Sequence, residues 1–373
     1  MQSKKFLSVF AFLVMPFVGH ASVHEVSCLD LIFSSTHDAK RVDQNDVQTN
    51  IEKILERRLG VPNSHGFFGP SSMMWELNRI PFLMLFAAPE LYMQLAHPPS
   101  AQGVVDYSQR LKKDPIRRFQ STFFDIWGIV FGTVEEASML ALRLSRIHGK
   151  ITGTLPTDAG SYKAGYQYSA NDPFALLWIH ATHWYAVLRT YEVFVRTLTD
   201  AERNVYIGET KIFAMLLGIP ENMIPSNWSE FKTYFDTMVS SPELTYSRDA
   251  RALEQHFRVM SREVERKNPA VWIARKYSDA ITASTLPKKL AEQFDFERSR
   301  TKNALYVAAL SALRFSYPLI PRWGGELPLY RMAMARARGA APDPKDELLY
   351  KAFMGRANFY QFAQEAAKIA LKR

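Results

Sequence analysis

An apolar stretch in the middle of the chain limits the folds that are open to it. Asp172 supplies a helix N-cap, Pro173 stands at the first helical position, and the sequence FALLWIHATHWYAVLRTYEVF follows. Apolar residues lie on nearly every side of its helical repeat, which is typical of a helix buried all round in a large domain. His180, His183 and two threonines interrupt the run, so a membrane span is the weaker interpretation. We expect this helix to be the central element.

Helix signals recur along the rest of the chain, whereas alternating β-branched runs bounded by turns are almost absent. Thr133 opens the capping box TVEE, and Thr199 forms a second box with Glu202. The Asp-Pro pair at 114–115 repeats the N-cap and proline device, opening a helix expected to run through Ile129. These signals predict an all-α fold: a single large multi-helix domain around the buried central helix.

The C-terminal half predicts further amphipathic helices. From Thr199 they continue to about Arg262, with a break at the Gly-Ile-Pro sequence of 218–220 and a restart near Asn227. The remaining helices are expected near 246–265, 300–315 and 344–371, with the proline-rich sequence PLIPRWGGELP separating the last two.

The first residues have the form of a secretory signal. A lysine pair at 4–5 precedes an apolar run over 6–18, and the small residues Gly19 and Ala21 stand where signal peptidase reads. We predict cleavage after Ala21 and export to the periplasm or the medium. An uncleaved anchor is the alternative, but the run is short for a bilayer and contains Pro16.

Composition supports a large core without disulfides. The chain of 373 residues is 47% hydrophobic and 13% aromatic, and its one cysteine, Cys28, cannot form an intramolecular disulfide. Loss of residues 1–21 would remove two lysines and no acid, which lowers the formal charge from +9 to +7. The basic residues do not gather with aromatics into a nucleic-acid-binding stripe, so we expect no nucleic-acid partner. A positive charge does favour anionic surfaces, and peripheral contact with a membrane is left open.

One histidine lies on an apolar stripe of the helix that Thr133 opens. Ala137, Ala141, Leu144 and His148 share one side of this helix, which predicts that the histidine faces inward. A histidine so placed is more often a core residue than a ligand. The glycines at 149 and 153 remove bulk here, which would let a flat macrocycle approach, although a helix C-cap also explains them.

The helix that begins at Asp114 and Pro115 carries Arg118 and Thr122 one turn apart on one face. An arginine and a hydroxyl beside an apolar stripe can bind a haem propionate or polarise bound oxygen. The alternative is a boundary arginine whose stem covers the core while its head reaches water.

His97 stands before Pro98, where the proline stops a helix. It can contact a cofactor edge or cap the carbonyls of the helix end. The sequence contains no HExxH, CxxC, glycine-rich phosphate loop or GxSxG, which leaves zinc hydrolysis, nucleotide binding and α/β-hydrolase chemistry without a motif. Paired Glu-x-x-His motifs of a di-iron bundle are missing as well.

Seven short segments resemble, in order, the blocks of the MpaB and rubber-oxygenase (latex-clearing protein) catalytic domain, over roughly residues 70–335. They are QLAHPPSAQGVVDYS, DPIRRFQST, FGTVEEA, RIHGKITGTLP, YSANDPFALLWIHAT, TLTDAERNVYIGETKIFAMLLGIP and NWSEFKTYFDTM. The resemblance divides the chain into a signal peptide (1–21), an N-terminal extension (22–69), a haem domain (70–335) and a C-terminal helical extension (336–373).

The resemblance implies an all-helical protein that binds one haem b and cleaves double bonds of an isoprenoid with oxygen. The axial histidine of the family stands at the His-x-x-Val/Ile position of the IHGKI block, which is His148 here, and its Arg-x-x-x-Thr pair matches Arg118 and Thr122. His97 and His180 fall in family blocks too and are expected near the cofactor. Asp172 and Trp178, in the same blocks, are candidates to support these residues.

Two departures separate this chain from latex-clearing proteins. Ser121 stands where those proteins carry a lysine that can cap the iron, and between 98 and 113 Asp106 is the one acid where they carry a glutamate proposed as a base. The resemblance therefore favours an oxygenase of the broader MpaB-like branch, acting on an unsaturated, lipidic or isoprenoid-like small molecule and O2. A non-catalytic haem carrier or sensor is the alternative, and a helical interaction protein without a cofactor is a second one.

Overall fold

The structure, a computed structural model, describes residues 40–107, 115–267, 278–296 and 299–354. The signal sequence, Asp114 and the second half of the helix expected over 344–371 lie outside these residues. The described chain is almost entirely helical, which confirms the predicted all-α class. Within it, no helix combines the length and the apolar character that crossing a bilayer demands.

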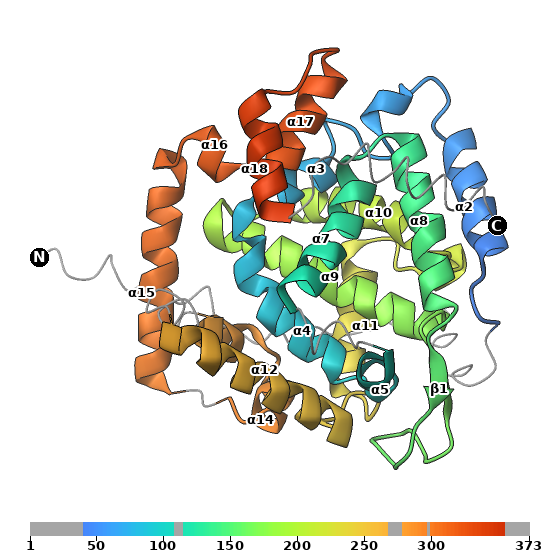
Figure 1. Ribbon diagram of the computed structural model, residues 1–373, viewed down its shortest axis with the longest axis vertical. Helices are drawn as coiled ribbons and strands as arrows, with labels where there is room; N and C mark the ends of the chain where they lie inside the picture. The colour runs from blue at the N-terminus through green and yellow to red at the C-terminus, as the bar shows by residue number, and fades with distance from the viewer. Residues whose placement is uncertain (1–39, 108–114, 268–277, 297–298, 355–373) are drawn as a thin grey trace, which may run out of the picture.

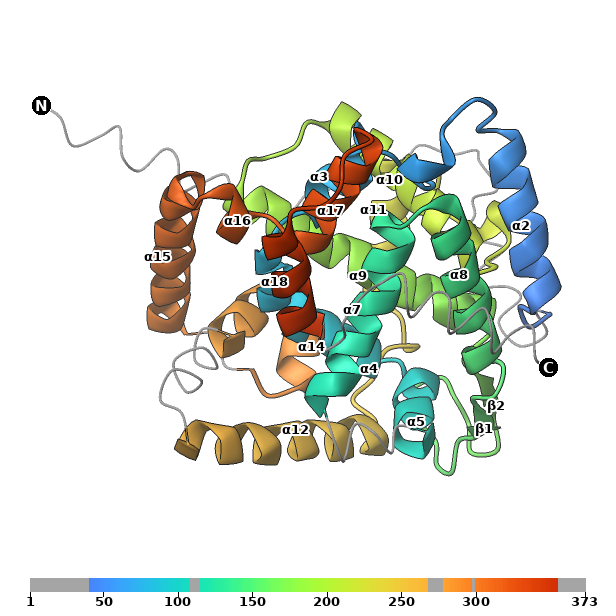
Figure 2. The same ribbon diagram turned by 45° about the horizontal axis from the view of Figure 1, so that its top comes forward.

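Helix α9 (Pro173–Phe194) is the central element, as predicted, and it runs through the middle of the molecule in both views (Figure 1, Figure 2). Asp172 caps it by accepting hydrogen bonds from the backbone amides of Phe174 (2.8 Å) and Ala175 (3.3 Å). Side chains are buried along its whole length, from Pro173 to Phe194. This burial explains why its sequence is apolar on nearly every side.

The other described elements surround α9. The N-terminal ones are α2 (Gln44–Glu56), η2 (Asn63–His65), α3 (Met73–Asn78), η3 (Pro81–Phe86), α4 (Ala87–Leu95), α5 (Pro98–Tyr107), α7 (Pro115–Phe131) and α8 (Val134–His148). After α9 come α10 (Asp200–Leu216), η4 (Glu221–Met223), α11 (Trp228–Ser240), α12 (Arg248–Lys267), α14 (Lys288–Gln293), α15 (Arg300–Ser316), η5 (Tyr317–Leu319), α16 (Arg322–Gly325), α17 (Pro328–Ala337) and α18 (Pro344–Met354). One continuous hydrophobic cluster joins most of them, from Val42 in the N-terminal segment to Met354 in α18.

Helices α7 and α8 form an antiparallel hairpin, joined by Gly132 and Thr133. The predicted capping box is present: the Thr133 hydroxyl accepts from the Glu136 amide at 3.2 Å, and the Glu136 carboxylate accepts from the Thr133 amide at 2.8 Å. Both bonds satisfy amides that the first turn of a helix leaves without partners. The sequence therefore determines where α8 begins.

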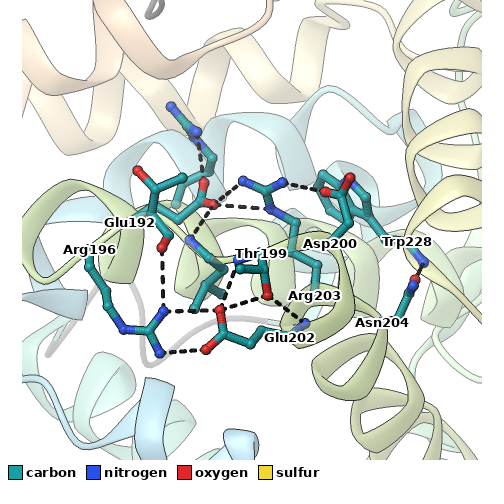
Figure 3. Close-up of polar contacts among 11 residues, drawn as sticks. Glu192, Arg196, Thr199, Asp200, Glu202, Arg203, Asn204 and Trp228 are labelled. Carbon is teal, nitrogen blue, oxygen red and sulfur yellow. Dashed lines mark hydrogen bonds and ion pairs between the residues drawn. The ribbon is translucent and has the colours of Figure 1, made fainter. Parts of the chain in front are cut away.

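A polar network joins α9, α10 and α11 (Figure 3). The predicted capping box of Thr199 and Glu202 opens α10, and Arg196 pairs with the same Glu202. Glu192, at the end of α9, is buried and accepts from Arg203 of α10, with Nε at 3.1 Å. These contacts fix the turn between the central helix and the next one.

Two features differ from the sequence expectation. A small antiparallel pair, β1 (Thr152–Thr154) and β2 (Gln167–Ser169), follows α8, and strands of this length are too short for an alternating pattern. Helix α17 begins at Pro328, inside the region expected only to separate two helices, because a proline is favoured at the first helical position. No helix was expected between those near 300–315 and 344–371, so α17 is an element that the sequence did not predict.

Candidate functional site

The α7–α8 hairpin brings the predicted ligand and its neighbours toward one end. Asp125 of α7 and Arg143 of α8 form an ion pair, which sets the level at which the two antiparallel helices face each other. From this level Arg118 lies about 10 Å back along α7 and His148 about 7 Å onward along α8, at a rise of roughly 1.5 Å per residue. Both distances run in the same direction, so the backbones at 118 and 148 lie at a similar height along the hairpin. The helical repeat turns His148 away from the side of α8 on which Arg143 meets α7.

His148 is the last residue of α8 and is partly buried. The apolar stripe that leads to it is confirmed for Ala137 and Ala141, which are fully buried, whereas Leu144 and His148 lie nearer the surface. The histidine thus closes the stripe at the rim of the core. Its backbone carbonyl accepts from the Ile151 amide at 2.9 Å, which links the helix end to the strand that follows.

Thr122 is partly buried on α7, and Arg118 stands on the same helix one turn earlier. The structure describes the backbone of Arg118 and not its side chain. Ser121 is partly buried beside Thr122. The segment after α8 lies beside α5. A Cβ placed on Gly103 of α5 would lie 3.4 Å from the Ile151 side chain and 3.5 Å from the Tyr168 ring.

The two glycines after His148 differ in their surroundings. A Cβ at Gly153 would lie 2.6 Å from the Tyr168 hydroxyl and 2.8 Å from its ring, so Gly153 makes room for protein and not for a macrocycle. Gly149 is exposed, and a Cβ there would meet the Ser145 carbonyl oxygen at 3.3 Å. Gly149 is the C-cap of α8 with ordinary right-handed angles, so the C-cap interpretation holds for it.

His97 lies between α4 and α5 and is buried. Its Nδ1 contacts the Ser100 hydroxyl and its Nε2 the Tyr162 hydroxyl, both at 2.8 Å. Burial lowers the pKa of His97 from 6.5 to about 3, so the ring is neutral at physiological pH. A histidine with both nitrogens bonded to hydroxyls links α4, α5 and the segment before β2.

His180 lies on the side of α9 that faces α10. Its Nδ1 accepts from the Trp184 indole at 2.8 Å, and its ring stacks on Phe213 with centroids 6.2 Å apart. Burial, with a smaller effect of nearby His183, lowers the pKa of His180 to about 3. The structure therefore places His97 and His180 in separate hydrogen-bonded settings. Trp178, on the same helix, donates from its indole to the Met93 carbonyl at 3.0 Å.

A buried carboxylate–histidine pair was not singled out from the sequence. Glu90 of α4 contacts Nδ1 of His183 at 3.0 Å, and the Nε2 atom of this histidine is buried with no hydrogen-bond partner among the described residues. Because a carboxylate only accepts hydrogen bonds, Nδ1 of His183 is the donor to Glu90, and Nε2 is the nitrogen that can accept a hydrogen bond. The one sequence signal was an acid within the apolar helix 87–95, and 93 residues separate the partners.

Two hollows lie near the predicted residues. One, of about 30 Å³, is bordered by His97, Tyr162, Asp172 and Glu243, and has room for little more than water. The other, of about 270 Å³, opens between the start of α2 and the end of α8 beside Arg41, Arg146 and Gly149. No three His, Cys, Asp or Glu side chains of the described ranges gather into a metal site.

Comparison with known proteins matches this helical assembly to one family. A family model described as the catalytic domain of the ER-bound oxygenase mpaB/B′ and rubber oxygenase fits residues 75–315, from α3 to α15. The chain belongs to the mpaB/rubber-oxygenase family. The match includes the α7–α8 hairpin and the whole of α9, so the predicted family and the oxygenase class are confirmed.

Two relatives of this mpaB/rubber-oxygenase family member come from Mycobacterium bovis and Mycobacterium tuberculosis, and each is described as an uncharacterized protein. Each is 23% identical over 241 residues, which cover 64% of this chain and 90% of the relative. No solved structure matches the chain significantly.

Proposed function

We propose that this protein is a haem-b-dependent oxygenase that acts on an unsaturated, lipidic or isoprenoid-like molecule, with His148 as the axial ligand of iron. The family match supports the oxygenase class. The observation that carries the haem assignment is the arrangement of the α7–α8 hairpin. In this antiparallel hairpin the backbone positions 118 and 148 lie at a similar height along the two helices, which supports the proposal.

The side chains at this end of the hairpin fit haem b by their chemistry. An imidazole is the commonest axial ligand of haem iron, a guanidinium binds carboxylates such as the haem propionates, and a hydroxyl donates a hydrogen bond. His148 is partly buried at the edge of the core. A haem bound there would be reachable from solvent on one side and could pack against apolar side chains on the other. Both ring nitrogens of His97 contact hydroxyls, which speaks against His97 as the iron ligand.

Haem b would supply the oxygen chemistry, while the protein supplies binding, orientation and a dry setting. In this proposal His148 would hold the iron through one ring nitrogen. Arg118 would bind a propionate or lie beside the oxygen, and Thr122 would offer a hydroxyl donor on the same face of α7. Ser121 cannot act as the lysine of latex-clearing proteins does, and Asp106 is engaged with Gln102 and with the Tyr168 hydroxyl. A substrate other than rubber is therefore favoured.

A visible spectrum tests the cofactor. The purified protein is expected to show the absorption of haem b, and His148→Ala is expected to lose most of the haem or to shift the spectrum. His65→Ala is the matched control, because His65 is also partly exposed but lies before the family-matched region. A wild-type protein that stays haem-free after reconstitution, or a His148→Ala variant with a full complement and unchanged spectrum, contradicts the assignment.

An oxygen electrode tests the activity. Uptake is expected with a panel of isoprenoids and unsaturated fatty acids, and the amount consumed should match the double bonds cleaved. A protein that holds haem but consumes no oxygen with any of them would be the carrier or sensor of the alternative hypothesis.

We also propose that the protein is exported. The lysine pair, the apolar run over 6–18 and the small residues before position 22 support this proposal. An intact mass that corresponds to a chain starting at Ser22, recovered outside the cytoplasm, is the expected result.

A further inference from the structure

Helix α15 forms one edge of the molecule, with the other helices on one side of it (Figure 1, Figure 2). Its inner side rests on a small core of its own. Leu310 is 8% exposed and belongs to a cluster with Phe86, Ala186 and Phe194, and Tyr306 and Leu313 pack against that cluster. These contacts attach α15 to α9 and determine which side of it faces outward.

The outward side of α15 is uncharged. Ala304, Ala308, Ala312 and Phe315 are exposed on successive turns, with Thr301 and Ser311 exposed on the same side, and Phe315 is 81% exposed. An exposed helix side is usually charged, because its side chains lose nothing by pointing into water. Single exposed hydrophobic residues need no explanation, but a ring as large and as exposed as Phe315 on an uncharged side indicates a contact surface.

Two larger apolar side chains are exposed in the segment that follows α15. Leu319, at the end of η5, is 75% exposed, and Trp323, in α16, is 67% exposed. Together with Phe315 they are spaced four residues apart. We call the set Ala304, Ala308, Ala312, Phe315, Leu319 and Trp323 the α15 apolar face.

Charge around the α15 apolar face has one sign. Between Ser299 and Gly325 the sequence has four basic residues, Arg300, Lys302, Arg314 and Arg322, and no acidic one. Arg314 and Arg322 are exposed beside Phe315 and Trp323. Apolar side chains flanked by arginines complement a surface with an apolar interior and negatively charged headgroups.

We propose that the α15 apolar face docks on the surface of an anionic lipid bilayer, with α15 in the plane of the membrane. Phe315, Leu319 and Trp323 would enter the boundary between headgroups and acyl chains, where tryptophan is favoured. Arg314 and Arg322 would contact lipid phosphates.

A second copy of the chain fits this face less well. In a symmetric dimer the same patch meets itself, so each arginine would approach arginines of the other copy with no acid between Ser299 and Gly325 to neutralise them. Membrane docking is argued independently of the proposed function. The proposed function adds only a reason for docking, because a lipidic substrate could be taken from the membrane to which the protein binds.

Vesicle co-sedimentation tests the proposal, with the full chain as the host processes it. Binding is expected to vesicles of phosphatidylcholine with phosphatidylglycerol, and weaker binding to phosphatidylcholine alone. The variant Phe315→Ser/Leu319→Ser/Trp323→Ser is expected to bind about tenfold more weakly. Leu59→Ser/Leu348→Ser is the control, because these leucines are 87% and 68% exposed elsewhere on the molecule.

Replacing the charges tests the electrostatic part. Arg314→Gln and Arg322→Gln are each expected to weaken binding to the anionic vesicles about fivefold and to reduce its salt dependence, with little effect on neutral vesicles. Tryptophan fluorescence of the wild type should shift to the blue on binding, and less in a Trp323→Tyr variant.

Three outcomes would overturn the proposal. In the first, the wild-type protein binds neither kind of vesicle. In the second, the triple variant binds vesicles as well as the wild type does. In the third, the wild type is a dimer and the triple variant a monomer, which would assign the face to a second copy. Haem content and oxygen uptake with a detergent-dispersed substrate are measured on the same samples. Loss of vesicle binding with haem retained is expected for the triple variant, whereas absence of haem from all samples speaks against the proposed function alone.

Discussion

Individual histidines in this protein differ in what their ring nitrogens contact. Both ring nitrogens of His97 contact hydroxyls, and Nδ1 of His180 accepts a hydrogen bond from the Trp184 indole. Nδ1 of His183 is hydrogen-bonded to the Glu90 carboxylate. Each of these rings is buried, whereas His148 lies partly exposed at a helix end. Burial lowers the pKa of His97 and of His180, which makes the stability of the fold depend on pH.

Acid should destabilise the protein through His97. Its pKa is about 3 in the folded state and 6.5 when unfolded, so the unfolded chain binds the proton first as pH falls. The stabilisation is complete above pH 6.5 and is lost between 6.5 and 3, by about 1.4 kcal/mol per pH unit. In urea titrations at a series of pH values, His97→Asn should reduce this slope by up to that amount.

An unchanged slope in His97→Asn would mean that His97 takes up its proton equally in the folded and unfolded chains, contrary to its burial between Ser100 and Tyr162.

At the scale of elements, the start of α8 matters because this helix carries His148. Thr133→Ala removes the acceptor for the Glu136 amide and should cost about 1 kcal/mol of unfolding free energy. Thr133→Ser keeps the hydroxyl and should restore most of it. Thermal unfolding measures both. The proposed haem spectrum should not change, since the cap lies at the opposite end of α8 from His148.

The turn from α9 to α10 depends on Glu192 (Figure 3). Its carboxylate is buried and accepts from Arg189, from Arg203 and from the Leu198 amide. Glu192→Gln removes the charge that pairs with both arginines, and we expect a loss of about 2–3 kcal/mol in chemical denaturation.

The matched control is Asp158→Asn. Asp158 pairs with Lys163 on the surface, where the two side chains are 60% and 78% exposed, so the expected cost is under about 1 kcal/mol. Equal costs for the two variants would show that Glu192 is no more than a surface charge.

At the scale of the whole molecule, the hairpin with the candidate site is supported by elements outside the family match. Helix α2 packs on α8, and α17 and α18 pack on α7, all beyond residues 75–315 (Figure 1, Figure 2). The Gln44 side chain donates to the Leu142 carbonyl of α8 at 3.3 Å, and Arg336 of α17 donates to the Phe131 carbonyl of α7. The flanking regions are therefore part of the same core.

A core substitution in α2 measures this support. Ile51 is 4% exposed and belongs to the main cluster, so Ile51→Ala should cost about 2–4 kcal/mol, in a single cooperative transition. Leu59→Ala, at a residue 87% exposed, should change stability by less than about 0.5 kcal/mol. A separate early transition in Ile51→Ala would instead mark α2 as an independent unit.

Local sequence was enough to specify the all-α class, the central helix and the starts of α8, α9 and α10. Asp172, Thr133 and Thr199 act on amides within three residues of themselves, so local sequence contains all the information that a cap requires. The order of short blocks also determined the family, and it was the basis for choosing His148.

Only the tertiary structure decided which residues meet. Asp125 with Arg143, His97 with Tyr162, and Glu90 with His183 lie 18, 65 and 93 residues apart, and no local pattern encodes such contacts. Packing of the whole chain assigned Gly153 to the Tyr168 ring and left the outer side of α15 uncovered. Local periodicity predicts which face of a helix is apolar, but whether that face meets protein or solvent depends on every other element.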